Sequence, residues 1–129
     1  MRFALIALIL LSPPIFALEG DATYYTEESC KREGTSGVWT ASGKRFDEKA
    51  LTCAMRRRDW GSKFKITNMA NGKEIVVTLN DFGPGKGPSA KGVVIDLTPA
   101  GFKELGAGKK GKLRVKVEQI EKAPKKKKR

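Results

Sequence analysis

Three aspartates are the residues best suited to chemistry in this chain. Asp81 ends an apolar segment and precedes one rich in Gly and Pro, Asp96 is embedded in apolar sequence, and Asp47 follows an aromatic residue. A carboxyl group flanked by apolar residues tends to have a raised pKa, which suits a general acid. Structural roles compete with this interpretation, because Asp96 can cap a following helix and Asn80 with Asp81 can form a turn. The residues alone leave both readings open.

The rest of the composition excludes several kinds of site. The chain contains no histidine, which removes Ser-His-Asp and Cys-His catalysis as well as histidine metal sites. Its two cysteines, Cys30 and Cys53, are too few for a four-thiolate zinc site. We therefore expect no metal and no cofactor.

Length and charge describe a small, basic, globular protein. The chain has 129 residues, of which 40% are hydrophobic and 31% charged, so it holds one modest core. Lys and Arg number 26 against 14 Asp and Glu, a net charge of +12. Such a balance favours anionic partners.

The two ends are expected to lie outside the folded domain. Residues 1–17 have the pattern of a cleaved signal peptide: a positive start, then an apolar run of nine residues, too short for a membrane span of about twenty. We expect a protein that is secreted or periplasmic within the cell envelope, with no lipid anchor, because no cysteine follows the run. Residues 122–129 end in five consecutive positive charges and predict a disordered tail that binds an anionic wall or membrane surface rather than nucleic acid. The domain between them spans residues 18–121.

The predicted export favours a disulfide between the two cysteines. In an oxidising compartment, two cysteines predict one disulfide, here between Cys30 and Cys53. Closing that loop would add about 3 kcal/mol of stability by the chain-entropy estimate. The alternative is a pair of free thiols, one of them nucleophilic.

The domain is predicted to be mainly β. β-branched, aromatic or alternating segments predict strands at 22–26, 64–67, 73–79, 93–95 and 113–117. Asn71-Gly72 predicts a hairpin turn. Thr98 as N-cap and Pro99 as the first helical residue predict one short helix. The segment 83–89 lacks the Lys-Ser/Thr of a phosphate-binding loop and is expected to be a flexible loop. Short strands separated by turns, with a single short helix, favour a small β-barrel or β-sandwich.

Several segments, in order, resemble the rare lipoprotein A (RlpA) family. Thr40-Ala41-Ser42-Gly43 through Asp47 is similar to its T-A-S-G-E-x-Y/F-D motif, and Val76 to Pro84 is similar to V-V-V-x-V-N-D-R-G-P. The other matching segments are Thr52 to Ser62, Ile66 to Gly72 and Val94 to Thr98. Together they extend from about Ala22 to Ile120.

The resemblance implies a fold and an activity. The fold is a six-stranded double-psi β-barrel with one or two short helices, shared with expansins and one family of endoglucanases. The activity is that of a lytic transglycosylase, which cleaves MurNAc–GlcNAc bonds of peptidoglycan, prefers glycan strands stripped of peptides and leaves 1,6-anhydro-MurNAc ends. One carboxyl group suffices for this chemistry, acting first as acid and then as base. We expect a monomer whose partners are such strands.

The resemblance also assigns residues. Asp81 is the first choice for the catalytic acid, Asp47 its electrostatic partner, and Asp96 the reserve, since its position matches the acid of the barrel-sharing endoglucanases. Residues expected to bind sugar are Tyr24, Tyr25, Thr40, Ser42, Trp60 and Asn80.

Three departures from the family pattern support an alternative. Lys44 stands where the family has an acid, Met55 where it has histidine, and Phe82 where it has arginine after Asn-Asp. Losing charged groups near the site would leave a groove that binds sugar without cutting it. The alternative function is therefore a non-catalytic, expansin-like protein that binds and loosens polysaccharide.

Overall fold

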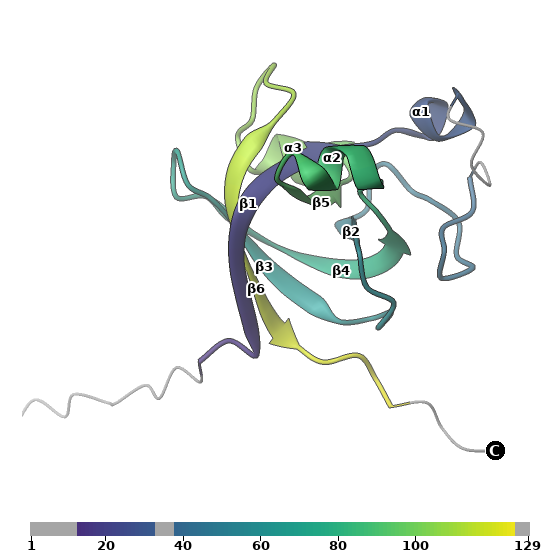
Figure 1. The fold of residues 1–129 in the computed structure, drawn as a ribbon, viewed down its shortest axis with the longest axis horizontal. Helices are drawn as coiled ribbons and strands as arrows, with labels where there is room; N and C mark the ends of the chain where they lie inside the picture. The colour runs from purple at the N-terminus through teal and green to yellow at the C-terminus, as the bar shows by residue number, and fades with distance from the viewer. Residues whose placement is uncertain (1–12, 33–37, 126–129) are drawn as a thin grey trace, which may run out of the picture.

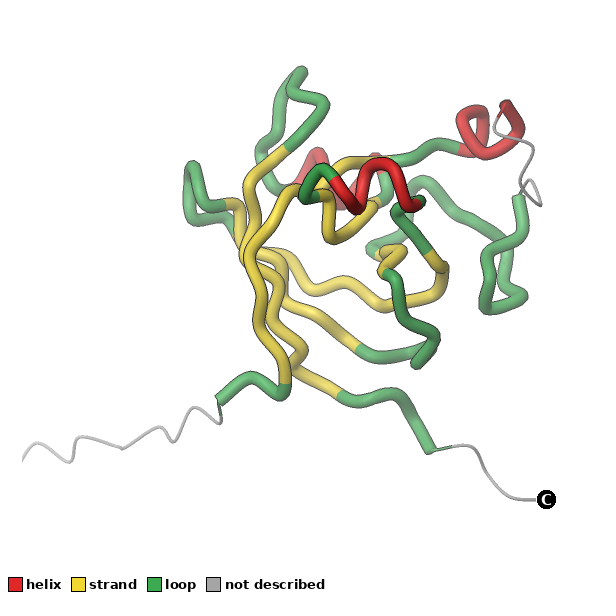
Figure 2. The backbone as a smooth tube through the Cα atoms, viewed as in Figure 1, coloured by secondary structure: helices red, strands yellow, loops and turns green. Residues whose placement is uncertain are grey.

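The computed structural model describes residues 13–32 and 38–125 of the chain. Within these ranges it contains six strands and three short helices (Figures 1 and 2). In chain order they are β1 (Phe16–Tyr24), α1 (Glu27–Arg32), β2 (Thr52–Met55), β3 (Lys63–Asn68), β4 (Glu74–Phe82), α2 (Lys86–Ala90), β5 (Val93–Leu97), α3 (Pro99–Glu104) and β6 (Leu113–Glu121).

The six strands close into one barrel in the order β1-β5-β2-β4-β3-β6. Two of the neighbouring pairs, β1 with β5 and β2 with β4, are parallel, and the other four are antiparallel. Closure leaves no strand with an unpaired edge. The closed, mixed, six-stranded barrel confirms the predicted fold class, with three helices where one or two were expected.

Alternating side chains build the core of the barrel. β3 buries every second residue, and β4 and β6 follow the same rule over most of their length. Phe64, Val77, Leu79, Val115 and Val117 point inward and are fully buried. Each such side chain contributes about 1.5–3 kcal/mol relative to an exposed one, so the core, rather than any single bond, stabilises the barrel.

β2 is the strand that the sequence pattern did not predict. It is only four residues long and lies between β4 and β5, and three of its four residues are buried. A short segment that is buried on both faces does not alternate, so its sequence lacks the period of two that marks the other strands.

The disulfide predicted between Cys30 and Cys53 is not present, and that prediction is corrected. Cys53 lies on β2, is fully buried in the core and carries a free thiol. Its neighbours across the sheet are Leu79 on β4 and Leu97 on β5, whereas α1 lies outside the barrel (Figure 1). Burial raises the pKa of the Cys53 thiol well above its usual value, and the nearby Asp96 carboxylate adds to the rise.

The predicted hairpin connects β3 to β4 and also anchors α3. Gly72 adopts a positive φ of 76°, and Asn68 N–H donates to the Lys73 carbonyl oxygen at 2.9 Å. The side-chain amides of Asn68 and Asn71 donate to the carbonyl oxygen of Leu105, at 2.8 and 3.0 Å. The asparagines therefore hold the end of α3 against the turn.

Two of the helices lie in the segments around β5. Thr98 caps α3 as predicted, accepting from Gly101 N–H at 3.2 Å, with Pro99 as the first helical residue. α2, in contrast, occupies part of the segment expected to be a flexible loop. Ser89 N–H donates to the Gly85 carbonyl oxygen at 3.0 Å, which closes a helical turn despite the glycines.

The first strand begins before the expected domain boundary. Phe16 and Ala17 pair with Gln119 and Glu118 on β6, so the predicted cleavage after Ala17 lies inside β1. Residues 1–12 of the predicted signal peptide and residues 126–129 of the predicted tail lie outside the described part of the chain. Among the described residues, no helix is long and apolar enough to cross a membrane.

Candidate functional site

Two of the three candidate aspartates lie on one row of residues across four adjacent strands. Thr23 on β1 pairs with Asp96 on β5, Asp96 pairs with Ala54 on β2, and Ala54 pairs with Asp81 on β4. The short strand β2 therefore separates the two carboxylates, and Ala54 contributes only a methyl group between them.

A β-bulge sets the direction of Asp81. Cys53 pairs with Leu79 and the next residue, Ala54, pairs with Asp81, which leaves Asn80 as an extra residue in β4. A bulge locally changes the direction of side chains and is frequent beside active sites. The Asn80 side-chain oxygen is buried and has no hydrogen-bond partner among the described residues. The bulge thus places Asp81 on the outer side of the barrel wall, next to an unsatisfied acceptor.

The two carboxylate oxygens of Asp81 have different environments. Oδ1 accepts hydrogen bonds from the backbone N–H groups of Ala41 and Phe82, both at 2.9 Å. Among the described residues, Oδ2 receives one long hydrogen bond, 3.4 Å, from the Tyr25 hydroxyl. Oδ1 is therefore fixed by two backbone donors, whereas Oδ2 is held less tightly.

The segment around Ala41 is a compact loop folded onto β4. Thr40 is buried, and its backbone N–H and its hydroxyl both donate to the Lys44 carbonyl oxygen, each at 2.8 Å. The Ser42 hydroxyl lies 2.8 Å from the Thr40 hydroxyl, and Ser42 N–H donates to the Asn80 carbonyl oxygen at 3.2 Å. Thr40 and Ser42 thus hold the loop that presents Ala41 N–H to Asp81.

Tyr25 is held by an aromatic neighbour. Its ring stacks on Phe46 with centroids 4.5 Å apart and planes 26° from parallel. Its backbone N–H donates to the Leu97 carbonyl oxygen at 3.2 Å. The stacking and this backbone bond orient the tyrosine hydroxyl toward Asp81.

Asp96 is enclosed more tightly. Its Oδ1 accepts a short hydrogen bond from the Thr23 hydroxyl. A Cβ atom placed on Gly83 would lie 3.2 Å from Asp96 Oδ2 and 3.6 Å from the Ala54 methyl carbon. The backbone after Asp81 therefore approaches Asp96 closely, and glycine at position 83 makes room for the carboxylate.

The structure does not bring Asp47 into contact with Asp81. Asp47 is exposed, and its Oδ1 accepts from Lys49 N–H at 2.9 Å in a local turn. It lines a separate pocket of about 530 Å³ together with Glu27, Arg45, Phe46, Glu48 and Lys49.

The aromatic candidates other than Tyr25 lie elsewhere. Tyr24 packs on Phe102 of α3, with centroids 4.9 Å apart, and Trp60 is partly buried against the core. Trp39, in contrast, is 56% exposed and pairs with Arg45 across the loop that carries Ala41. Of the aromatic candidates, Tyr25 is therefore the one that the structure shows in contact with Asp81, and Trp39 lies next to the loop that donates to Asp81.

Sequence reasoning missed three consecutive arginines that follow β2. Arg56 and Arg58 place their guanidinium groups over the ring of Phe82, with Cζ at 5.2 and 4.6 Å from its centroid. Each such contact contributes about 0.5–1 kcal/mol at an exposed site. The sequence does contain a signal for this pair: Arg56 and Arg58 are two residues apart, and residues i and i+2 of an extended chain point to the same side.

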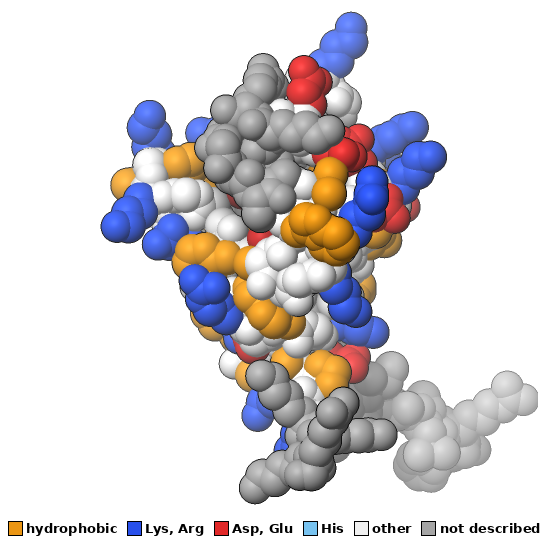
Figure 3. Space-filling view, turned by 90° about the vertical axis from the view of Figure 1, so that its right-hand side faces the viewer, with side chains coloured by type: hydrophobic (Ala, Val, Ile, Leu, Met, Phe, Trp, Pro, Cys, Tyr) orange, Lys and Arg blue, Asp and Glu red, His pale blue; other side chains and the backbone are white. Residues whose placement is uncertain are grey.

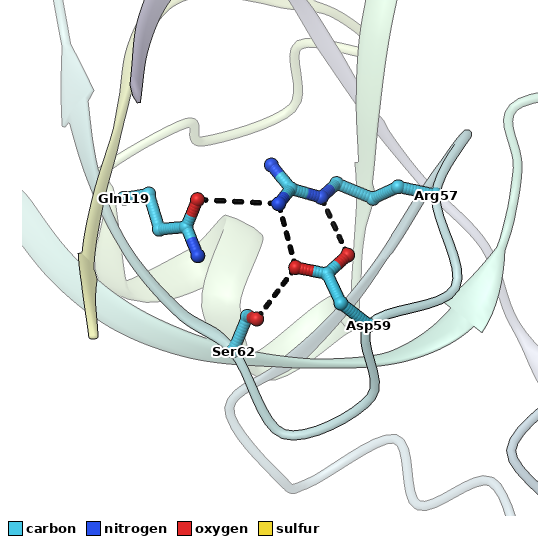
Figure 4. Close-up of polar contacts among 4 residues, drawn as sticks. All are labelled: Arg57, Asp59, Ser62 and Gln119. Carbon is cyan, nitrogen blue, oxygen red and sulfur yellow. Dashed lines mark hydrogen bonds and ion pairs between the residues drawn. The ribbon is translucent and has the colours of Figure 1, made fainter. Parts of the chain in front are cut away.

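Arg57 points the other way and closes one end of the barrel (Figure 4). Its Nε and Nη2 donate to the two carboxylate oxygens of Asp59, both at 2.6 Å, and Nη2 also donates to Gln119 at 3.2 Å. The Ser62 hydroxyl donates to Asp59 at 2.7 Å. Burial acts to raise the pKa of the Asp59 carboxyl, but the hydrogen bonds from Arg57 and Ser62 outweigh it, so the pKa lies below its usual value.

Among the described residues, no group of three or more Cys, Asp or Glu side chains is arranged to hold a metal ion.

Comparisons with known proteins agree with the barrel fold. A family model described as lytic transglycolase matches residues 17–117. The probable endolytic peptidoglycan transglycosylase RlpA of Nostoc sp. is 34% identical over 104 residues, covering 81% of this chain and 26% of that protein. The endolytic peptidoglycan transglycosylase RlpA of Yersinia pestis is 37% identical over 116 residues, covering 90% of this chain and 29% of that protein. The chain thus spans less than a third of the length of these two relatives.

A solved structure shares the fold. The Streptomyces papain inhibitor superposes with a TM-score of 0.60 at 21% identity, covering 84% of this chain and 97% of the inhibitor. At this identity the likeness shows the fold alone.

Proposed function

Because the chain belongs to the lytic transglycolase family, we propose that it is a lytic transglycosylase that cleaves MurNAc–GlcNAc bonds of peptidoglycan, with Asp81 as its acid and base. The observation that carries this proposal is the asymmetry of the Asp81 carboxylate. Two backbone N–H groups hold Oδ1 at 2.9 Å, whereas the Tyr25 hydroxyl, at 3.4 Å, is the one donor to Oδ2 in the described part of the chain. One oxygen is fixed and the other is available for proton transfer. A single residue that first donates a proton and then accepts one needs such a free oxygen.

The proposed reaction needs no water. Protonated Asp81 donates its Oδ2 proton to the glycosidic oxygen as the bond to C1 of MurNAc breaks. The carboxylate then accepts the proton of the C6 hydroxyl of the same MurNAc, whose oxygen attacks C1. The product is a 1,6-anhydro ring, and Asp81 regains the proton that it donated.

Asp96 and Asp47 take supporting roles in this proposal. Asp96, across Ala54 from Asp81, is the second carboxylate on the row and is suited to stabilise positive charge that develops on the sugar ring. Asp47, which is exposed and bonded in its own turn, contributes only long-range electrostatic interaction.

The substrate is proposed to be glycan strands stripped of their peptides. Tyr25 and Asn80 are the predicted sugar-binding residues nearest to Asp81, whereas Thr40 and Ser42 support the loop that donates to it. Tyr24 and Trp60 would contact only more distant sugars of a bound strand. Export through the predicted signal peptide would bring the protein to this polymer, and the basic tail would retain it on an anionic surface.

The decisive experiment incubates the exported protein with purified, peptide-free glycan strands and analyses the products by mass spectrometry. We expect fragments with 1,6-anhydro-MurNAc ends, one water lighter than hydrolysis products. Asp81→Asn should abolish them while leaving the fold and strand binding intact, because the amide keeps the shape but does not transfer the proton. Asp47→Asn serves as the matched control and should retain most of the activity. Fragments with free reducing ends would instead identify a hydrolase.

A second candidate is the non-catalytic, expansin-like binder. Two observations favour it: Met55, where the family has histidine, is buried, and Phe82, where it has arginine, brings no charge of its own. In the same experiment this function predicts strand binding that is unaffected by Asp81→Asn and no fragments at all.

A further inference from the structure

Phe82, the residue after Asp81, carries two arginine side chains on its ring. The Cζ atoms of Arg58 and Arg56 lie 4.6 and 5.2 Å from the ring centroid. Arg56 is fixed further by a hydrogen bond from its Nη1 to the Pro84 carbonyl oxygen at 2.9 Å. The Phe82 ring is 38% exposed, and both arginines are exposed, so this group of three residues lies at the surface.

No ion pair among the described residues neutralises the charge of this group. In the part of the chain that the structure describes, neither Arg56 nor Arg58 forms an ion pair with a carboxylate, whereas Arg57 between them is fully engaged by Asp59. Two like charges brought to one ring repel each other, and a bound anion relieves that repulsion. Each guanidinium offers five N–H donors in a planar array that matches a carboxylate.

The position of the group relates it to Asp81. Phe82 follows Asp81 directly in β4, and Arg56 follows the β2 residues Ala54 and Met55 that pair with Asp81 and Phe82. The arginine pair is therefore anchored to the segment that immediately follows the proposed catalytic residue. On the face of the molecule shown in Figure 3, hydrophobic side chains are bordered on both flanks by Lys and Arg side chains. Positive side chains are thus frequent on this face, as the net charge of +12 leads one to expect.

We propose that Arg56 and Arg58, supported by the Phe82 ring, bind the lactyl carboxylate of a MurNAc residue from which the peptide has been removed. This inference rests on the proposed function and deepens it. On a peptide-bearing strand the lactyl carboxyl forms an amide bond, which is uncharged and bulky. On a stripped strand it is a free carboxylate. The arginine pair thus supplies a physical reason for a preference for stripped strands, and it brings guanidinium groups to position 82 although residue 82 is not arginine.

The test compares two forms of one polymer. Peptide-free strands are used either with free lactyl carboxylates or with the same carboxylates converted to methylamides. Dissociation constants are measured with the Asp81→Asn protein, so that nothing is cleaved. We expect this protein to bind the free-acid strands at least about tenfold more tightly than the amidated strands at low salt, as for loss of a charge-assisted hydrogen bond.

Variants assign the preference to the two arginines. Arg56→Gln with Arg58→Gln, added to Asp81→Asn, should bind both forms equally and as weakly as the parent binds the amidated form. Lys109→Gln with Lys110→Gln removes the same charge from exposed residues in the α3–β6 connection and should keep the preference. Phe82→Leu should lower the preference by disordering the arginines while their charge is kept. Thermal unfolding of each variant, compared with the parent, confirms that the fold is retained.

The outcomes separate this inference from the proposed function. Two results would overturn the proposed binding of the lactyl carboxylate, even if 1,6-anhydro products form. The first is equal binding of both strand forms by the Asp81→Asn protein. The second is an undiminished preference for free-acid strands in the variant that also carries Arg56→Gln and Arg58→Gln. An arginine-dependent preference in a protein that yields no fragments would support the carboxylate site and reject the catalytic proposal.

Discussion

Asp81 on β4 and Asp96 on β5 pair with the same residue of β2, Ala54, from opposite sides. Two strand spacings separate their Cα atoms, roughly 10 Å. Each carboxylate has donors of its own, backbone N–H groups for Asp81 and the Thr23 hydroxyl for Asp96. The row therefore carries two carboxylates, one on each side of β2, each with hydrogen-bond donors of its own.

Removing the Tyr25 hydroxyl should affect turnover more than binding. Its 3.4 Å hydrogen bond reaches the Asp81 oxygen that carries the proton in the proposed mechanism. We expect Tyr25→Phe to lower kcat about two- to tenfold with little change in KM, the effect of a weak hydrogen bond. Tyr24→Phe is the control and should leave both constants unchanged, because Tyr24 packs on Phe102. Equal effects of the two variants would contradict a role for Tyr25 at Asp81.

The Asp59 network should make stability depend on pH in the acid range. Because the folded-state pKa of Asp59 is lowered, its contribution is complete above the unfolded pKa of about 3.9 and is lost as pH falls through the folded value. At pH 7 we expect Asp59→Asn to lower the free energy of unfolding by about 1–2 kcal/mol. Urea unfolding should show that this difference shrinks as pH falls below the unfolded pKa of about 3.9. Glu74→Gln, an exposed carboxylate on β4, should change stability little at either pH.

The strands that alternate were predictable, and the features that depend on neighbouring strands were not. β3 and β6 were expected because their side chains alternate, and β4 because a segment rich in Ile and Val follows the Asn71-Gly72 turn. The bulge at Asn80 exists only in the register between β2 and β4, which no local pattern encodes. For the same reason sequence reasoning grouped Asp47 with Asp81 and Asp96, although Asp47 is exposed and bonded within its own turn.

The cysteine prediction failed for a related reason. Spacing and compartment indicate whether a disulfide is favoured, but not which face of a strand carries the sulfur. Cys53 points into the core, where it behaves as a small apolar side chain. The arginines of segment 56–58 illustrate the same limit, since only the folded chain directs Arg57 inward and its two neighbours onto Phe82.

The buried thiol should be inert in the folded protein. Burial encloses Cys53 and raises its pKa, so little thiolate forms near neutral pH. We expect iodoacetamide to leave the peptide containing Cys53 unmodified in native protein and to alkylate it in concentrated guanidinium chloride. Peptide mapping without reduction provides the measurement. A peptide linked through Cys53 to Cys30 would restore the disulfide.

The basic tail should act through screened electrostatic attraction. Deleting residues 125–129, which carry five positive charges, should weaken retention on isolated cell walls at low salt. At about 1 M salt the Debye length falls to roughly 3 Å, so the full and shortened chains should be retained equally. Sedimentation with the walls measures both. Unchanged retention at low salt would show that the tail is not used.

Glycine at position 83 should matter to the site and not to the barrel. A Cβ at this position would lie 3.2 Å from Asp96 Oδ2, so Gly83→Ala forces that carboxylate or the backbone after Asp81 to move. Gly85→Ala is the matched control, because no atom lies within 4 Å of a Cβ added there. We expect Gly83→Ala to lower kcat/KM on stripped strands about tenfold or more, a shift in geometry that catalysis does not tolerate. Gly85→Ala should keep wild-type activity, and both variants should keep a Tm close to that of the parent. Activity of Gly83→Ala equal to that of Gly85→Ala would show that the position of Asp96 beside Asp81 has no part in the reaction.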